Sequence, residues 1–208
     1  MKLLIAVPCM DTIPTGFMQS LLGLQKRLIS DGINHDIAIQ SGTLVYMARN
    51  KLASKAINDG YDAVLWLDSD MIFNDAIYDD LSDSRKDFIS GVYHMRRGTF
   101  ASCVFKDIRL DHFTPWGDEY PRDVFEIAGC GFGCVLIKTD ILADVMKTYG
   151  TAFDPMKQIG EDIAFCQRAR DLGYKIFCDP FVRCGHIAHI TVYPDDAPRY
   201  RPVLEGQL

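Results

Sequence analysis

The first third of the chain alternates between short apolar runs and segments whose apolar residues recur at helical spacing. Residues 2–7 form an almost continuous apolar run that stops at Pro8, which is typical of a strand buried on both faces of a parallel sheet. Strands that alternate with helices in this way predict right-handed βαβ units and a mainly parallel sheet with helices on both faces, an α/β fold. The expected strands are residues 2–7, 35–40 and 62–67, and the expected helices are residues 17–28 and 45–56.

The remainder of the chain is less regular, with shorter apolar runs separated by polar stretches. The expected strands there are residues 88–93, 101–105, 124–127, 134–137 and 174–178, and the expected helices are residues 74–81, 142–149 and 161–172. A chain of 208 residues fits one domain with a single core. We therefore assign residues 1–190 to one domain, and residues 191–208, rich in proline, arginine and aspartate, to a tail or lid.

Charge and hydropathy argue against nucleic acid and membranes as partners. The net charge is −6, and the basic residues are scattered, with Arg96 and Arg97 in the longest cluster, whereas nucleic-acid binders normally carry a basic patch. The N-terminal apolar run is too short to span a membrane and shows no signal-peptide cleavage pattern. We expect a cytoplasmic protein with no integral membrane segment.

The seven cysteines lie in apolar segments. Their odd number and their placement indicate reduced thiols in the core rather than disulfides. Cys130 and Cys134 have no second pair at a matching spacing, which argues against a structural zinc site.

Two aspartates, Asp68 and Asp70, directly follow the third expected strand. Ligands of parallel sheets bind beyond the carboxyl ends of the strands, and both aspartates lie there. Carboxylates one residue apart can turn toward the same ligand, and they suit Mg²⁺ or Mn²⁺, which bridge carboxylate to pyrophosphate. The alternative is a solvated acidic turn before the helix at residues 74–81.

A second acidic pair, Glu161 and Asp162, follows Gly160 at the start of an expected helix. The helix dipole favours carboxylates in a first turn, and this alone can explain the pair. A functional reading is that one of them acts as a general base, positioned and kept ionised by the backbone amides of the helix start.

Two histidines, His186 and His189, follow the last expected strand. Imidazole is a good ligand for metals of the Mn²⁺ class, and a distant histidine could complete a site begun by Asp70. His186, beside a glycine, is the first candidate and His189 the second. The alternative for either is a structural role.

The order of these features resembles the GT-A glycosyltransferases, particularly their family-2-like group. The resemblance covers roughly residues 2–190: an apolar first strand ending in proline, an Asp-x-Asp motif, a glycine-rich approach to a strand, a Glu-Asp pair opening a helix and a late histidine. It implies the GT-A (nucleotide-diphospho-sugar transferase) fold, with a Rossmann-like, mainly parallel central sheet flanked by helices and a smaller mixed sheet near the active site.

The resemblance also implies roles for these motifs. The Asp-x-Asp motif of that family contacts the donor ribose and the metal, which maps onto Asp68 and Asp70 respectively. The Glu-Asp pair supplies the base in inverting members, which maps onto Asp162 or Glu161. The late histidine that ligates the metal in many members maps onto His186.

Further donor contacts follow from the same resemblance. The loop after the first strand usually holds the nucleotide base, which would place Pro8 and Cys9 beside it. Arg49 resembles an arginine that many members turn toward the nucleotide, although a solvated helix position explains it equally well. Gly131 resembles the segment that lets donor sugar and acceptor approach the backbone, since glycine lacks a Cβ atom; a plain turn would need glycine too.

The expected activity is that of a metal-dependent glycosyltransferase of the hexosyltransferase class. It would use Mn²⁺ or Mg²⁺ to move a sugar from a UDP- or GDP-sugar to a hydroxyl of a glycan, lipid or protein, by inverting single displacement. One alternative is a nucleotidyltransferase that makes nucleotide sugars, but residues 8–16 hold none of the basic residues of its phosphate loop. The other alternative is a non-catalytic module that binds nucleotide sugars.

Overall fold

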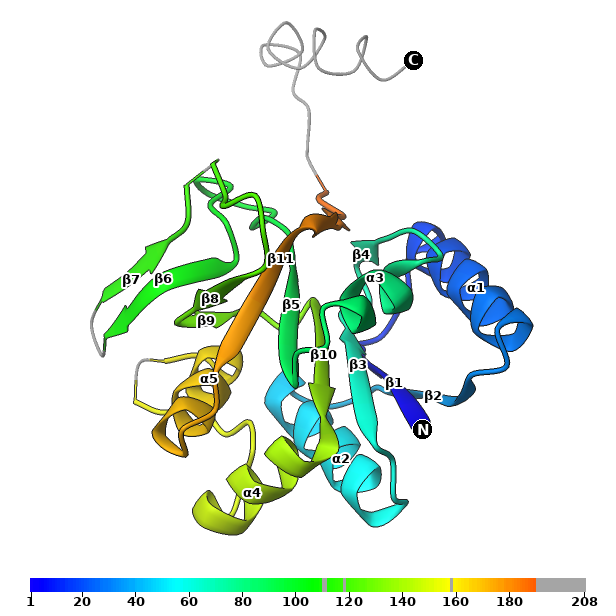
Figure 1. Cartoon of the computed structure of the whole chain (residues 1–208), viewed down its shortest axis with the longest axis horizontal. Helices are drawn as coiled ribbons and strands as arrows, with labels where there is room; N and C mark the ends of the chain where they lie inside the picture. The colour runs from blue at the N-terminus through cyan, green and yellow to red at the C-terminus, as the bar shows by residue number, and fades with distance from the viewer. Residues whose placement is uncertain (110–111, 118, 158, 190–208) are drawn as a thin grey trace, which may run out of the picture.

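The computed structural model of the chain describes residues 1–109, 112–117, 119–157 and 159–189. Its centre is a seven-stranded sheet in the order β2-β1-β3-β10-β5-β11-β8 (Figure 1). The pairings β1–β2, β1–β3 and β5–β11 are parallel, whereas β10 and β8 run antiparallel to their neighbours. The strands are β1 (Lys2–Pro8), β2 (Asn34–Gln40), β3 (Ala63–Leu67), β5 (Phe88–Val92), β8 (Phe125–Ile127), β10 (Cys134–Lys138) and β11 (Ile176–Arg183).

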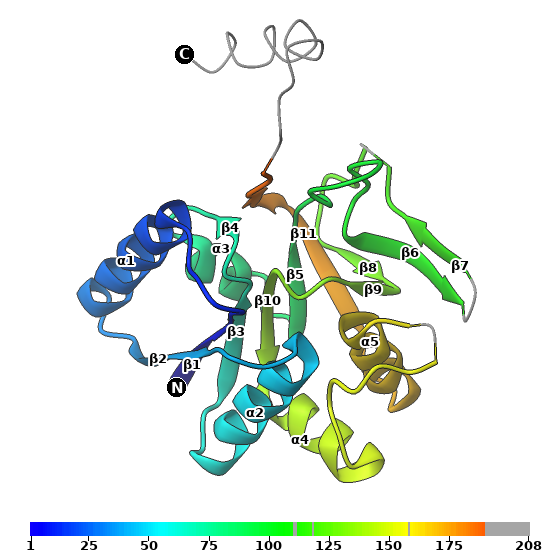
Figure 2. The ribbon, with the colours of Figure 1, turned by 180° about the vertical axis from the view of Figure 1, so that it is seen from behind.

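Helices cover both faces of this sheet, which confirms the predicted α/β class (Figures 1 and 2). Alternate residues of β1 face opposite ways, as the pleat requires: Leu3 belongs to the apolar cluster that includes α1 and α3, and Leu4 to the one that includes α2, α4 and α5. The described residues contain five helices: α1 (Thr15–Ser30), α2 (Val45–Asn58), α3 (Ile77–Asp83), α4 (Thr139–Tyr149) and α5 (Glu161–Asp171).

An aromatic cluster fixes the helix that carries the second acidic pair. Phe165 of α5 stacks on Phe153 with ring centroids 4.7 Å apart, and Phe132 packs edge-on against both, at 5.3 Å and 5.0 Å respectively. All three side chains are fully buried, and each such pair contributes about 0.5–1.5 kcal/mol beyond its buried area. Since Phe132 lies between Gly131 and Gly133, the cluster ties the start of α5 to the glycine-rich segment.

Two small antiparallel sheets stand where one smaller mixed sheet was expected. One joins β4 (Met71–Ile72) to β12 (Gly185–His186), and the other has the order β7 (His112–Pro115), β6 (Val104–Arg109), β9 (Gly129–Cys130). The β4–β12 pairing sets His186 opposite Met71, one residue beyond Asp70. This short pairing therefore brings the segment that follows β3 next to the segment that follows β11.

The second half does not continue the βαβ pattern of the first, and β10 shows this most clearly. This strand lies between β3 and β5 and runs antiparallel to both, because it enters the sheet from the edge where β3 ends. Strand β6 begins at Val104, later than predicted, and β11 continues to Arg183 with a register shift after Cys178. The predicted tail or lid at 191–208 lies outside the described residues, so the division of the chain into 1–190 and 191–208 stays a prediction.

Candidate active site

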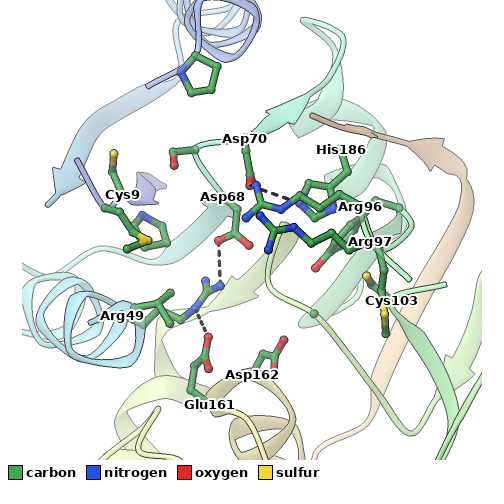
Figure 3. Close-up of a pocket in the computed structure, with 18 of the residues that line it drawn as sticks. Cys9, Arg49, Asp68, Asp70, Arg96, Arg97, Cys103, Glu161, Asp162 and His186 are labelled. Atoms are coloured by element: carbon green, nitrogen blue, oxygen red, sulfur yellow. Dashed lines mark hydrogen bonds and ion pairs between the residues drawn. The ribbon is translucent and has the colours of Figure 1, made fainter. Parts of the chain in front are cut away.

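A pocket of about 850 Å³ opens at the edge of the sheet where β1 and β3 end. This size is typical of small-molecule sites, which span roughly 300–1,000 Å³. The structure brings all the candidate site residues from the sequence to its lining: Pro8, Cys9, Arg49, Asp68, Asp70, Gly131, Glu161, Asp162, His186 and His189. Figure 3 labels these residues, except Pro8, Gly131 and His189.

Arg49 is buried and pairs with carboxylates from two other elements. Its Nη2 donates to Asp68 Oδ1 over 2.9 Å, and its Nε lies 3.5 Å from Glu161 Oε1. Only 3% of the Arg49 side chain is exposed, so it does not occupy the solvated position that the sequence left open. Burial alone would lower the pKa of Arg49, but the charges of Asp68 and Glu161 outweigh burial and raise that pKa.

Two nitrogens of Arg49, Nε and Nη1, are buried without a hydrogen-bond partner in the described part of the chain. A buried donor without a partner costs about 1–3 kcal/mol. Nε is nevertheless within ion-pair distance of Glu161 Oε1, at 3.5 Å.

Asp68 is held in place by the antiparallel neighbour of β3. Its backbone N donates to Gly133 O over 3.2 Å, at the point where β10 begins beside Leu67. Burial raises the pKa of Asp68, and the Arg49 guanidinium opposes this shift. The glycine-rich segment therefore positions the Asp-x-Asp motif as well as the pocket wall.

Asp70 is surrounded by cationic and imidazole nitrogens. Its Oδ2 accepts a hydrogen bond from Arg96 Nη1 and lies 3.4 Å from His186 Nε2. Burial works against the Asp70 charge, but His186 and Arg96 lower the pKa of Asp70 overall. The hydrogen bond to Asp70 is the main reason that the pKa of His186 is raised.

His186 is oriented through its other ring nitrogen. His186 Nδ1 donates to His94 O over 2.8 Å, so Nε2 is the nitrogen that faces Asp70. Ile187 N donates to Asp70 O over 2.9 Å and fixes the two segments side by side. Metal-binding histidines are usually supported by such a hydrogen bond from the second ring nitrogen.

These residues fit a divalent ion that is shared with a ligand. Among the described residues, no group of three His, Cys, Asp or Glu side chains is arranged to hold a metal. Asp70 and His186 nevertheless bring a carboxylate oxygen and an imidazole nitrogen to one point. Mg²⁺-type ions often take one or two protein carboxylates and complete their shell with water and substrate phosphates. In this structure the guanidinium of Arg96 supplies the positive charge at Asp70.

Asp162 lies in the first turn of α5 with its carboxylate toward the pocket (Figure 3). Its Oδ1 accepts a hydrogen bond from Ile163 N at 2.7 Å. Burial, and then the charge of Glu161, raise the pKa of Asp162 to about 6, while Arg49 acts against them. The sequence led us to expect that helix amides would keep this carboxylate ionised; burial outweighs that effect, although the group is still mostly charged at neutral pH.

Gly131 borders the space in front of Asp162. A Cβ atom at this position would lie 2.0 Å from Tyr93 Oη and 3.5 Å from Asp162 Oδ2. Glycine at this position therefore leaves room for the Tyr93 hydroxyl beside the carboxylate. The close approach of sugar and acceptor that the resemblance implied for Gly131 stays a prediction.

The pocket also contains residues that sequence reasoning did not assign to a site. Tyr93 Oη accepts a hydrogen bond from Gly133 N at 3.0 Å, and its ring packs edge-on against His186 with centroids 5.6 Å apart. Arg96 and Arg97 line the pocket from the loop after β5. The sequence held one signal for these residues, because the loop after β5 leaves the sheet at the edge where ligands bind. The arginines themselves could not be singled out, since residues in a loop carry no periodic pattern.

Comparisons with known proteins support the fold. No protein-family model matches the chain, and no curated protein matches it. The crystal structure of A197 from STIV is similar with a TM-score of 0.64 and 21% identity, over 91% of this chain and 87% of that one. GalNAc-T7, solved with UDP, GalNAc and Mn²⁺, is similar with a TM-score of 0.57 and 11% identity, over 98% of this chain.

The chain spans 47% of the GalNAc-T7 chain that it matches. At such low identities the likeness concerns the fold alone, a mixed α/β fold shared with a glycosyltransferase. Within the residues that the structure describes, no helix is both long enough and apolar enough to cross a membrane.

Proposed function

We propose that this protein is a GT-A glycosyltransferase that uses a nucleoside diphosphate sugar and a divalent ion. The observation that carries the proposal is the convergence of Asp70 and His186 on one point of an 850 Å³ pocket, beside the buried Arg49–Asp68 pair. The fold shared with GalNAc-T7, whose structure holds UDP, GalNAc and Mn²⁺, supports this choice of donor and ion.

The pocket residues divide into those that hold the donor and those that hold the ion. Asp70 and His186, assisted by Asp68, are the ligands for Mn²⁺ or Mg²⁺. When bound, the ion neutralises charge on the departing nucleoside diphosphate. Pro8 and Cys9 lie beside the nucleotide base.

Arg49 and Gly131 complete the donor side of the site. Arg49 places a positive charge beside the nucleotide and keeps Asp68 in position. Gly131 lies beside the sugar and the acceptor in front of Asp162, where its lack of a Cβ atom leaves room for the Tyr93 hydroxyl.

Asp162 is the general base of an inverting single displacement. It takes the proton of the acceptor hydroxyl while that oxygen forms a bond to the anomeric carbon and the bond from this carbon to the diphosphate oxygen breaks. Burial, which raises the pKa of Asp162 to about 6, makes it a stronger base than an ordinary aspartate while leaving it charged near neutral pH. Glu161, engaged with Arg49, is the second candidate for this role.

The proposed acceptor is a hydroxyl of a glycan, lipid or protein, and the proposed location is the cytoplasm. All seven cysteines are free thiols, and six of them are buried. Free thiols agree with a reducing compartment.

A nucleotidyltransferase fits less well, because the segment after β1 that lines the pocket contains no lysine or arginine. A non-catalytic binding module differs from the proposed enzyme in one measurable respect. Glycosyltransferases slowly transfer the donor sugar to water, so the enzyme should release UDP or GDP from a matching sugar nucleotide when Mn²⁺ is present. Tight, metal-dependent binding with no release of nucleotide, even with a broad set of acceptors, would favour the binding module.

A further inference from the structure

A second pocket, of about 430 Å³, lies against the first. The two pockets share a wall of four residues, Tyr93, Met95, Arg96 and His186. The second pocket continues on the far side of this wall, where it is lined by the loop after β5 and by the end of β11 with the residues that follow it. A molecule bound there would be a direct neighbour of the proposed donor and ion.

The second pocket has a charge opposite to that of the whole chain. The net charge of the protein is −6, yet no aspartate or glutamate among the described residues lines this pocket. Arg96 and Arg183 both line it. Arg96 is already paired with Asp70 of the first pocket, so Arg183 is the guanidinium left for a ligand. An acid-free lining with such a guanidinium favours an anionic ligand, since guanidinium forks match the geometry of carboxylate and phosphate.

The terminal nitrogens of Arg183 are available to donate hydrogen bonds to a ligand. Its Nε donates to Pro180 O over 3.2 Å, and no carboxylate in the described ranges pairs with its terminal nitrogens. Arg183 is the last residue of β11 and lies opposite Val92 of β5, so its backbone is anchored in the central sheet. A ligand would therefore meet a guanidinium on a rigid base.

Aromatic rings complete the lining. His94 Nε2 lies 3.2 Å from Tyr120 Oη, which donates to Ser102 Oγ over 2.8 Å, so the Tyr120 ring is held in one orientation. Phe100 lines the same pocket and is 58% exposed. Its φ of 52° is a left-handed conformation that costs a non-glycine residue about 1–2 kcal/mol. An exposed aromatic held at such a cost suits stacking on a sugar ring.

We propose that the second pocket binds a carbohydrate that carries a phosphate or a carboxylate. Arg183 binds the anion, and Phe100 and Tyr120 contact the sugar ring. The assignment of this carbohydrate as part of the acceptor rests on the proposed glycosyltransferase function. The binding itself does not rest on it.

The test is direct titration of the full chain by calorimetry with glucose 6-phosphate, glucuronate, glucose and inorganic phosphate. At least one of the two anionic sugars should bind about tenfold more tightly than glucose and than inorganic phosphate. The better of the two identifies the anion. Equal affinity for glucose would overturn the anion assignment, and equal affinity for inorganic phosphate would overturn the sugar assignment.

Two arginine variants locate the binding. Arg183→Gln should weaken the anionic sugar at least fivefold, whereas Arg109→Gln, the same change at an exposed position of β6 outside both pockets, should leave it unchanged. Binding that is insensitive to Arg183→Gln but is competed by UDP would belong to the first pocket and would contradict the proposal.

The same variants separate this inference from the proposed function. Arg183→Gln should retain Mn²⁺-dependent binding of a sugar nucleotide, because Arg183 does not line the first pocket. If sugar nucleotides bind and anionic sugars do not, only the second pocket is wrongly assigned. If anionic sugars bind through Arg183 and no sugar nucleotide binds, the glycosyltransferase proposal fails, whereas the assignment of the second pocket is confirmed.

Discussion

Arg49 Nη2 donates to Asp68 Oδ1 over 2.9 Å, joining helix α2 to the end of strand β3 inside the pocket. Glu161 approaches the same guanidinium from α5, with Nε and Oε1 3.5 Å apart. One buried cation thus fixes the relative positions of the Asp-x-Asp motif and the second acidic pair. Its removal would leave two carboxylates without their counter-charge.

Arg49→Met should therefore destabilise the protein by about 3 kcal/mol, because it breaks a buried ion pair. This is the lower end of the usual range, since the Asp68 carboxylate that is left behind is 27% exposed to solvent in the pocket. Urea unfolding measures this change. Lys51→Met, an equivalent change at an exposed position of the same helix, should stay within about 0.5 kcal/mol of the parent. Equal stability of the two variants would show that the Arg49 ion pairs contribute little.

Asp162→Asn should reduce turnover by about 10²–10⁴-fold, because the general base is lost. The affinity for the donor should change little, because the substitution removes no contact to the donor. The parent enzyme, with saturating Mn²⁺, should lose activity as the pH falls through about 6, where Asp162 becomes protonated. In Glu161→Gln this limb should move to lower pH, since the charge of Glu161 helps to raise the pKa of Asp162. A limb that does not move, or transfer with retained anomeric configuration, would contradict the base role.

The charged Asp162 carboxylate should lower the stability of the folded protein. The folded-state pKa of Asp162 is raised from 3.8 to about 6, so the folded protein holds this proton more tightly than the unfolded chain. Stability is then lost as the pH rises between about 4 and 6, and the loss is complete above that range. Asp162→Asn should stabilise the protein at pH 7–8, by about 3 kcal/mol, and should have little effect below pH 4. Urea unfolding across this pH range checks both the sign and the window.

Gly131→Ala should displace the Tyr93 hydroxyl from the pocket wall in front of Asp162. Its Cβ would lie 2.0 Å from Tyr93 Oη, so Tyr93 must shift, at a cost of about 1–3 kcal/mol for overpacking. Donor binding should weaken, and adding Tyr93→Phe should restore part of the stability, because the closest atom is removed. Gly117→Ala is the control, since no atom of the described residues lies within 4 Å of a Cβ at that position. Unchanged binding in Gly131→Ala would mean that donor and acceptor do not pass this glycine.

The regular first half of the fold could be predicted from the sequence because its signals are local. The apolar run at 2–7 and the helical stripe at 17–28 correspond to β1 and α1 within a few residues. The rule that ligands bind beyond the carboxyl ends of strands also anticipated the pocket at Asp68 and Asp70.

The remaining features depend on contacts that the sequence does not encode locally. The antiparallel direction of β10 follows from the path by which the chain re-enters the sheet, and the two-residue strands β4 and β12 are too short to have a period. Arg96 reaches Asp70 from 26 positions along the chain. The raised pKa of Asp162 reflects burial under neighbouring elements, which no pattern around residue 162 records.

The central claim is that the pocket binds a nucleoside diphosphate sugar through an ion held by Asp70 and His186. The most direct measurement is thermal unfolding with a panel of UDP-, GDP- and CDP-sugars, each with and without Mn²⁺. One donor should stabilise the protein only when Mn²⁺ is present, by about 2.7 kcal/mol at a ligand concentration 100-fold above its Kd. Asp70→Asn should abolish this shift, whereas Asp83→Asn, at an exposed position of α3, should preserve it. Stabilisation that is independent of Mn²⁺, or that survives in Asp70→Asn, would contradict the claim. So would the absence of stabilisation by every sugar nucleotide in the panel.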